Sequence, residues 1–404
     1  MTDSPGSLWA DSKQRSTLLL FMLAAFVLRA AYALFIAPQE LIFPDEQTYL
    51  TYAKAWLGME PLPEGYKQAF VMPVYPLVVG ALTWLGQGGF WLVRLVQAAV
   101  SALTLAPVAI IAYRLHPSRL TVIAACLAMT LYPFFIFYTS LLLTETLFLF
   151  VVALFFQMLL QPELKRKGLL SGVVAGFGHL LRPVFMLFLP VAWAWQLLFK
   201  RARVSQVLIC ALVFAVLAAT WAVRNYEVLG EPLLTTTTSG RTLYEGNNPM
   251  SVDGGVCPEG FSPTRGMPEG LNEIEVNQWQ KEQAVAYIKE NPGRFLTLCW
   301  KRFLRFWNPI PNAEQYSSGL YAWLSILSFG PVLILALLSI WVLRRQWKST
   351  VVIWLFIGYV TALHMVTIAS IRYRLPLEPL LIALAAACLG KIPTPGVSPH
   401  EKSD

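Results

Sequence analysis

The chain has 404 residues, of which 56% are hydrophobic and only 13% are charged, and its mean hydropathy is +0.55. Soluble domains carry about 25% charged residues, so this composition excludes an ordinary soluble fold and indicates a polytopic helical membrane protein. The net charge of +8 does not indicate a nucleic-acid partner, because Lys and Arg collect in the cytoplasmic loops of membrane proteins.

The beginning of the chain predicts one spanning helix and then a long outer loop. The apolar run 17–36 has about the ~20 residues of a spanning helix, and we expect it to be an uncleaved signal anchor. The loop 37–89 follows, and near its start lie the adjacent carboxylates Asp45 and Glu46. Its segment 73–85 is apolar but short, so it predicts either a span or a helix at the membrane surface.

Nine more apolar runs follow, and the distribution of basic residues decides how many helices span the membrane. The runs lie at about 90–113, 119–138, 140–160, 168–182, 184–199, 206–225, 319–343, 350–369 and 373–390. The short basic segments all fall on one side of the membrane only if 73–85 does not span. We therefore predict an all-α fold with about ten transmembrane helices, both termini in the cytoplasm, and 73–85 as a juxtamembrane helix. Pro183 predicts a tight hairpin between the fourth and fifth of these runs, because proline disfavours a continuous helix.

The predicted organisation has four parts. They are an N-terminal membrane module at 1–226, an outer region at 227–318, C-terminal membrane helices at 319–392 and a polar tail at 393–404. The apolar spacing within the outer region predicts a helix over 271–290.

A second helix of the outer region is predicted over 294–307, where aromatic and basic residues alternate. This pattern is typical of a helix that lies on a membrane surface. Two cysteines of the outer region, Cys257 and Cys299, could form a disulfide on that side of the membrane.

Two acidic positions on the predicted outer side are candidates for chemistry. Asp45 can act as a general base or a metal ligand, or it can simply cap the helix that follows. Glu145 lies near the outer end of an apolar run, where a deep carboxylate costs ~2.5–3.5 kcal/mol. That cost favours a cavity or a partner, unless Glu145 is an end residue that reaches the interface.

Several arginines also lie within or at the ends of apolar runs. Arg372 and Arg374 flank Tyr373 at the outer end between the last two runs, and two guanidiniums suit a phosphate or pyrophosphate. Lipid headgroups are the alternative ligand for this pair. The others need an anionic partner or water and could form structural ion pairs; they include Arg94, Arg182 and Arg224. The chain has no phosphate-binding glycine motif, so a phosphorylated donor must come from the membrane or from outside.

These residues, taken in order, resemble a known family. The chain resembles the polyprenyl-phosphate-sugar-dependent glycosyltransferases of the C superfamily, and it is nearest to the group that holds the protein O-mannosyltransferases and the lipid A aminoarabinose transferases. The resemblance rests on Asp45-Glu46, Pro73-Val-Tyr-Pro76, Arg94-Leu-Val-Gln97, Thr144-Glu145, Leu181-Arg182-Pro183, Trp221-Ala-Val-Arg224-Asn225-Tyr226, Gly246-Asn247-Asn248-Pro249, Tyr287-Ile-Lys-Glu-Asn-Pro292 and Arg372-Tyr373-Arg374-Leu-Pro376.

The resemblance implies a lipid-phosphate sugar donor, inversion at the anomeric carbon and an active site on the periplasmic or lumenal face. It implies that Asp45 is the catalytic base, that Glu46 is the adjacent acid, and that Glu145 is the acid of the second outer loop. The chain departs from some relatives because Met72, not a lysine, precedes Pro73. The nearest lysine is Lys67.

The expected site follows from this chemistry. Asp45 takes the proton of an acceptor hydroxyl, and preorganised cations stabilise the charge on the leaving phosphate. The cations we expect are Arg372 and Arg374, with Lys67 and Arg182 behind them. The resemblance adds further substrate contacts at Tyr75, Arg94, Arg224, Asn247 and Tyr373. If a divalent cation binds, its expected ligands are Asp45 and Glu145.

We expect the protein in a bacterial inner membrane, with a glycan, lipid or protein as acceptor and the site facing the periplasm. Two alternatives are a transporter or flippase of lipid-linked glycans, and a polymerase or ligase of surface glycans. A transporter predicts internal repeats and acids near the bilayer midplane, which the chain does not show. The transferase further requires that Asp45 lie within about two helix diameters, ~20 Å, of Glu145 or Arg372.

Overall fold

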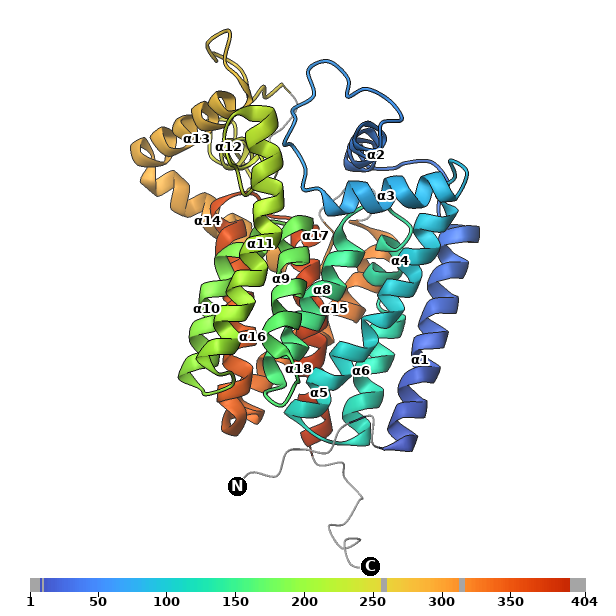
Figure 1. Cartoon of the computed structure of the whole chain (residues 1–404). Coiled ribbons are helices and arrows are strands. Elements are labelled where there is room, and N and C mark those ends of the chain that lie inside the picture. Colours follow the sequence, from blue (N-terminus) through green and yellow to red (C-terminus); the bar gives the residue numbers. More distant parts are fainter. Residues whose placement is uncertain (1–7, 9–10, 256–259, 312–316, 393–404) are drawn as a thin grey trace, which may run out of the picture.

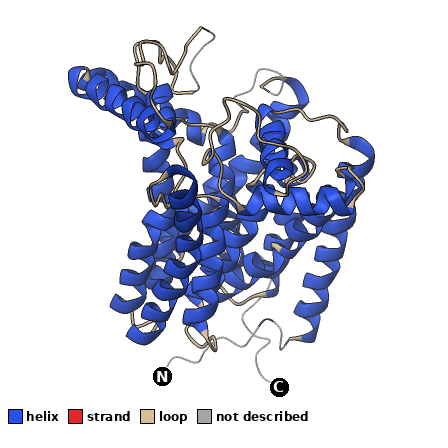
Figure 2. Cartoon of the chain, turned by 45° about the horizontal axis from the view of Figure 1, so that its top comes forward, coloured by secondary structure: helices blue, strands red, loops and turns tan. Residues whose placement is uncertain are grey.

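The structure is a computed structural model that describes residue 8 and residues 11–255, 260–311 and 317–392. Throughout these ranges the regular secondary structure is helical, without strands (Figure 2). The predicted all-α class is therefore confirmed. Cys257 lies outside the described residues, so its pairing with Cys299 stays a prediction.

Among the described residues, six helical segments are long and apolar enough to cross a membrane. They are α1 (Ser12–Ala31) with η2 (Tyr32–Ile36), α4 (Trp91–Leu103) with α5 (Leu105–Leu115), α11 (Val204–Leu229), α15 (Gly319–Val342), η4 (Arg344–Gln346) with α16 (Trp347–Val366), and α17 (Ile371–Arg374) with η5 (Leu375–Leu377) and α18 (Glu378–Lys391). Figure 1 shows them standing side by side as a bundle.

Four shorter apolar helices complete the bundle. They are α6 (Arg119–Leu131), α8 (Glu145–Leu160), α9 (Lys167–Leu181) and α10 (Val184–Leu198), and they stand beside the long helices (Figure 1). By contrast, α3 (Val74–Leu85) lies across the upper end of the bundle, as expected of a juxtamembrane helix. Each of the ten predicted spans thus corresponds to a helical segment, of which six are long enough to cross a membrane, and the hairpin at Pro183 separates α9 from α10.

Two predicted boundaries are wrong. The run 119–138 is broken after Leu131, because Pro133 begins a separate helix, α7 (Pro133–Tyr138), and Tyr132 takes an extended conformation. The next run begins its helix only at Glu145, not at residue 140. The apolar stretch before it turns back on itself, and its Leu142 N–H donates to the Glu46 carboxylate from the first outer loop (2.8 Å).

The last helix, α18, is the centre of the bundle. It packs against α5, α6 and α15. In the segment Ile371–Lys391, 83% of an apolar stretch of 18 residues is buried, compared with 17% of such a stretch in Ser12–Ile36. The small residues 385–387 of α18 allow this close packing. Because α17 leads through η5 into α18, Arg372 belongs to the most buried of the six long helical segments.

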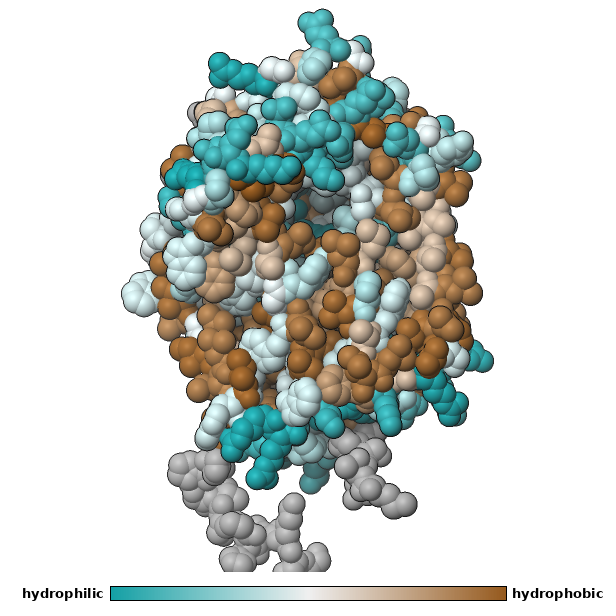
Figure 3. Space-filling model, turned by 90° about the vertical axis from the view of Figure 1, so that its left-hand side faces the viewer, coloured by the Kyte–Doolittle hydropathy of each residue, from teal (hydrophilic) through white to brown (hydrophobic). Residues whose placement is uncertain are grey.

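The two ends of the bundle differ in character. At the end where α1 begins, basic residues bind backbone carbonyls: Lys167 Nζ donates to Arg201 O (3.3 Å) and Lys391 Nζ to Val342 O (3.0 Å). The opposite end carries α2 (Pro44–Trp56), α3, α12 (Ser239–Gly246), α13 (Glu273–Glu290) and α14 (Pro292–Trp307) (Figure 1). An apolar band separates the two polar ends on the face drawn in Figure 3.

Helices α13 and α14 agree with the predicted outer helices. Asn272 caps α13 by accepting from Ile274 N and Glu275 N, and Glu275 Oε2 accepts in turn from Asn272 N (2.8 Å). This capping box fixes the start of the helix. Pro292 ends α13 and begins α14.

Candidate active site

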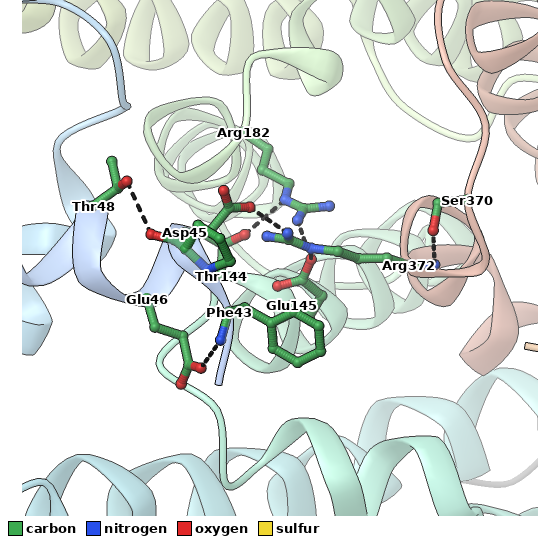
Figure 4. A network of polar contacts seen from close by, with 10 residues as sticks. Phe43, Asp45, Glu46, Thr48, Thr144, Glu145, Arg182, Ser370 and Arg372 are labelled. Atoms are coloured by element: carbon green, nitrogen blue, oxygen red, sulfur yellow. Dashed lines mark hydrogen bonds and ion pairs between the residues drawn. The ribbon is translucent and has the colours of Figure 1, made fainter. Parts of the chain in front are cut away.

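Two acids and two arginines from four separate parts of the chain meet at the end of the bundle that carries α2 and α3. Arg372 of α17 donates from Nη1 to Asp45 of α2 and from Nε to Glu145 of α8. Arg182, between α9 and α10, also donates to Glu145, and its Nε donates to Thr144 Oγ1 (2.8 Å) (Figure 4). The structure thus brings together residues that are 327 positions apart in the chain.

Helix ends position each of these groups. Asp45 lies in the first turn of α2, directly after Pro44, and Glu145 is the first residue of α8. The positive end of a helix dipole stabilises a carboxylate there. Arg182 follows the last residue of α9, where a cation is favoured, and Ser370 Oγ caps α17 by accepting from Arg372 N (3.4 Å).

The two carboxylates have very different exposure. The Glu145 side chain is completely buried between two guanidiniums, whereas 54% of the Asp45 side chain is exposed. Breaking a buried ion pair by removing one partner costs about 3–5 kcal/mol, and an exposed pair contributes about 0–1 kcal/mol. Glu145 therefore holds the two arginines in place, while Asp45 is free to exchange partners.

Asp45 and Arg372 lie in the wall of one cavity of about 680 Å³. This volume lies within the range of small-molecule sites. Apolar side chains form much of the remaining wall, from α7 (Pro133, Phe134, Ile136, Phe137, Tyr138) and from α15 (Tyr321, Leu324). Polar residues line it too, from α12 and its N-cap (Thr238, Arg241, Thr242, Glu245) and from α14 (Arg305).

Tyr49 is a member of this region that the sequence analysis missed. It lies one turn after Asp45 on α2, and its ring meets the ring of Tyr75 edge-on at 4.9 Å. Burial raises the pKa of the Tyr49 phenol, while the nearby Arg372 and Arg182 act in the opposite direction. The phenol therefore stays protonated. The sequence did contain a signal for this residue, because Tyr49 lies four residues after Asp45 on an amphipathic helix and so on the same face of it.

Glu46 does not face the cavity, which corrects its expected role. Its Oε2 accepts from Ile42 N (2.8 Å) and Phe43 N (2.9 Å), and its Oε1 accepts from Leu142 N (2.8 Å). Figure 4 shows it turned toward the backbone of Phe43, away from Arg372. The buried carboxylate therefore joins the first outer loop to the turn before α8.

Arg374 requires the same correction. Its Nε donates to Glu378 (2.9 Å), its Nη1 donates to the carbonyls of Phe306 (3.0 Å) and Asn308 (2.8 Å), and its guanidinium lies over the Phe329 ring. Both members of this ion pair are fully buried. Arg374 thus joins α17 to the end of α14 and is not among the residues that line the cavity.

The remaining predicted contacts divide into one residue in the cavity wall and several in the framework. Tyr373 lines the cavity, and its ring stacks on His364 at 4.6 Å. The framework residues each bind backbone or a neighbouring side chain: Tyr75 OH to Gln97 (3.0 Å), Arg94 to Pro38 O and Gln39 (both 2.7 Å), Arg224 to Gln68 O (2.9 Å), and Asn247 to Val366 O (2.9 Å).

Lys67 is also outside the cavity lining. Its ammonium is buried without a hydrogen-bond partner, and burial lowers its pKa while the charge of Glu273 raises it.

The carboxylates do not fit a divalent cation in this arrangement. Among the described residues, no group of three or more His, Cys, Asp or Glu side chains converges. Asp45 and Glu145 both bind Arg372, so a guanidinium already links the two expected ligands. Mg²⁺ and Ca²⁺ require about six or more oxygen ligands, which this pair does not supply alone.

Comparison with known proteins gives structural matches only. No protein-family model and no curated protein matches the chain. The archaeal oligosaccharyltransferase AglB from Archaeoglobus fulgidus, in complex with an inhibitory peptide and a dolichol-phosphate, is similar with a TM-score of 0.52 and 11% identity. The match covers 94% of this chain, which spans about half (50%) of that protein. ArnT from Cupriavidus metallidurans, bound to undecaprenyl phosphate, has a TM-score of 0.42 and 14% identity, with 93% and 78% of the two chains covered.

The TM-score of 0.52 with AglB, over nearly the whole of the present chain, carries the structural argument. At this level of identity the likeness concerns the fold alone. Over nearly its whole length, the chain therefore shares the fold of AglB.

Proposed function

We propose that the protein is an inverting glycosyltransferase that moves a sugar from a polyprenyl-phosphate donor to an acceptor hydroxyl. One observation carries this proposal: an exposed carboxylate, Asp45, and a guanidinium, Arg372, share the wall of a cavity that is otherwise rich in aromatic side chains. The fold supports the same class of reaction.

The transfer needs a base and a cation at the two ends of the reacting bond. The acceptor oxygen attacks the anomeric carbon, and Asp45 takes its proton as the new C–O bond forms. The bond from the anomeric carbon to the phosphate oxygen breaks, and the electron pair stays on the lipid phosphate. Arg372 is the cation placed to stabilise that charge, with Arg182 behind it.

The cavity wall suggests where the two substrates lie. The apolar surface of α7 and α15 suits the prenyl end of the donor, since α15 is one of the helices long and apolar enough to cross a membrane. Arg241, Thr242 and Glu245 of α12 suit the acceptor, which we propose is a glycan, lipid or protein.

The basic end of the bundle should face the cytoplasm by the positive-inside rule. The site would then face the periplasm of a bacterial inner membrane. We propose no step for a divalent cation, because the two acids of the site are bound by Arg372.

A transfer assay tests this function. The purified protein would be reconstituted in vesicles with undecaprenyl-phosphate sugars and a panel of glycan, lipid and protein acceptors, and the released undecaprenyl phosphate would be measured. We expect acceptor-dependent release that falls about 10²- to 10⁴-fold in Asp45→Asn, the range for loss of a general base. Glu60→Gln is the matched control, because it removes an exposed acid from the same outer loop, where Glu60 pairs with Lys54. Full transfer by Asp45→Asn, or movement of the donor across the membrane without transfer, would overturn the proposal.

A further inference from the structure

The contacts of Arg372 restrict how it can bind a phosphate. A guanidinium grips a phosphate bidentately with two neighbouring nitrogens, either Nε and Nη2 or Nη1 and Nη2. In the structure, Nε donates to Glu145 and Nη1 donates to Asp45. Each edge of the guanidinium therefore has one of its two nitrogens engaged by a carboxylate. A bidentate phosphate must displace one of these acids.

The two acids are not equally easy to displace. Glu145 is completely buried and also accepts from Arg182, so its removal would leave two partly buried guanidiniums without their shared partner. Asp45 is 54% exposed and lies in the first turn of α2, where water and the backbone N–H groups of the helix can stabilise its free charge. Asp45 is therefore the acid that a phosphate would replace.

We propose that the donor phosphate displaces Asp45 from Arg372, and that this exchange releases the base for the acceptor. The inference rests on the proposed function. The Asp45–Arg372 ion pair breaks and a phosphate–Arg372 pair forms, with no covalent change and no net transfer of a proton. Asp45 stays ionised and turns from the guanidinium to the acceptor hydroxyl.

This exchange gives the site a binding order. Before the donor binds, one oxygen of Asp45 accepts from Arg372, and the carboxylate is turned toward the guanidinium (Figure 4). After the donor binds, like charges separate Asp45 from the phosphate and favour its movement away. Glu145 and Arg182 keep the guanidinium in place during the change.

Binding of undecaprenyl phosphate tests this competition. Its dissociation constant would be measured in nanodiscs for the wild-type protein, Asp45→Asn, Asp45→Ala and the control Glu60→Gln. Removing the competitor should tighten binding in both Asp45 variants by about two- to five-fold, the range expected for loss of one exposed ion pair. Glu60→Gln should bind like the wild type, although it removes the same charge from the same loop.

The outcomes separate the inference from the function on which it rests. Equal or weaker binding by both Asp45 variants, in protein whose thermal unfolding is unchanged, would overturn the exchange. So would an equal gain in Glu60→Gln, since the effect would then be one of overall charge. If the wild-type protein does not bind undecaprenyl phosphate, the proposed function itself fails. Tighter binding by the Asp45 variants together with loss of their transfer supports both.

Discussion

Two clusters of arginine and carboxylate lie on opposite sides of α17, and they differ in what surrounds them. Arg372 lines the cavity beside Asp45 and binds the buried Glu145, whereas Arg374, two residues later, lies in the bundle with Glu378. Residues two apart on a helix point about 200° away from each other, so neighbours in the sequence reach separate environments.

The two clusters differ in how far they are exposed to solvent. The Arg374 cluster is fully buried and bound on several sides by backbone carbonyls and the Phe329 ring, so it has no room for a ligand. The Arg372 cluster contains one exposed acid beside a cavity, so one of its partners can be exchanged. The charge and the sequence spacing of these residues do not distinguish a structural ion pair from a binding site. The unequal burial of the two partners distinguishes them.

The largest effect on stability should come from the closed cluster. Glu378→Gln leaves the guanidinium of Arg374 buried without its counter-charge, so we expect the free energy of unfolding to fall by about 3–5 kcal/mol. Chemical unfolding of the purified protein in detergent measures this change. The double variant Arg374→Met/Glu378→Leu should recover much of the loss, because an apolar pair removes the buried charge. A loss below about 1 kcal/mol in the single variant would show that this cluster is open to water.

Arg372→Lys should give the opposite pattern, with loss of transfer and smaller loss of stability. A lysine cannot direct two nitrogens at Asp45 and Glu145, and Arg182 still neutralises Glu145. We expect the rate of transfer to fall about 10²- to 10³-fold, equivalent to ~2.7–4 kcal/mol of barrier. The measurement is kcat/KM for the lipid-phosphate donor.

The control for Arg372→Lys is Arg201→Lys at the basic end of the bundle, where Arg201 donates to Ser349 Oγ (2.9 Å). It should transfer at the wild-type rate. If Arg372→Lys is as destabilised as Glu378→Gln and keeps its rate per folded molecule, the two clusters do not differ in the way the structure indicates.

Parts of this comparison could be predicted from the sequence. Long apolar runs and the one-sided basic loops predicted the ten spans, and Pro183 predicted the hairpin before α10, because these signals are local. The predicted topology put Asp45, Glu145 and Arg372 on one side of the membrane, and the family resemblance implied that they share one site. The structure brings them together at one end of the bundle.

Other parts depend on tertiary contacts that no local pattern contains. Asp45 and Glu46 are adjacent carboxylates that the sequence alone does not distinguish. Only the structure shows that Glu46 accepts a hydrogen bond from the Leu142 N–H of a distant turn. The same contact explains why the helix begins at Glu145 and not at residue 140.

A smaller perturbation should reach the open cluster through the backbone. Gly246 ends α12, and a Cβ at this position would overlap the carbonyl oxygen of Thr367, which precedes the loop to α17. Gly246→Ala should therefore push that loop away from α12 and cost about 1–3 kcal/mol of unfolding free energy. Because the same loop carries Ser370, which caps Arg372, transfer should fall as well.

Gly293→Ala is the matched control for this glycine, since a Cβ there meets no atom within 4 Å and the residue lies in the first turn of α14. Thermal unfolding and donor KM should be measured for both variants. A rise in KM for Gly246→Ala alone would show that the position of Arg372 depends on α12, which carries part of the cavity wall. Equal KM values in the two variants, with only Gly246→Ala destabilised, would show instead that α18 holds Arg372 by itself and that the outer helices close the cavity without aligning its cation.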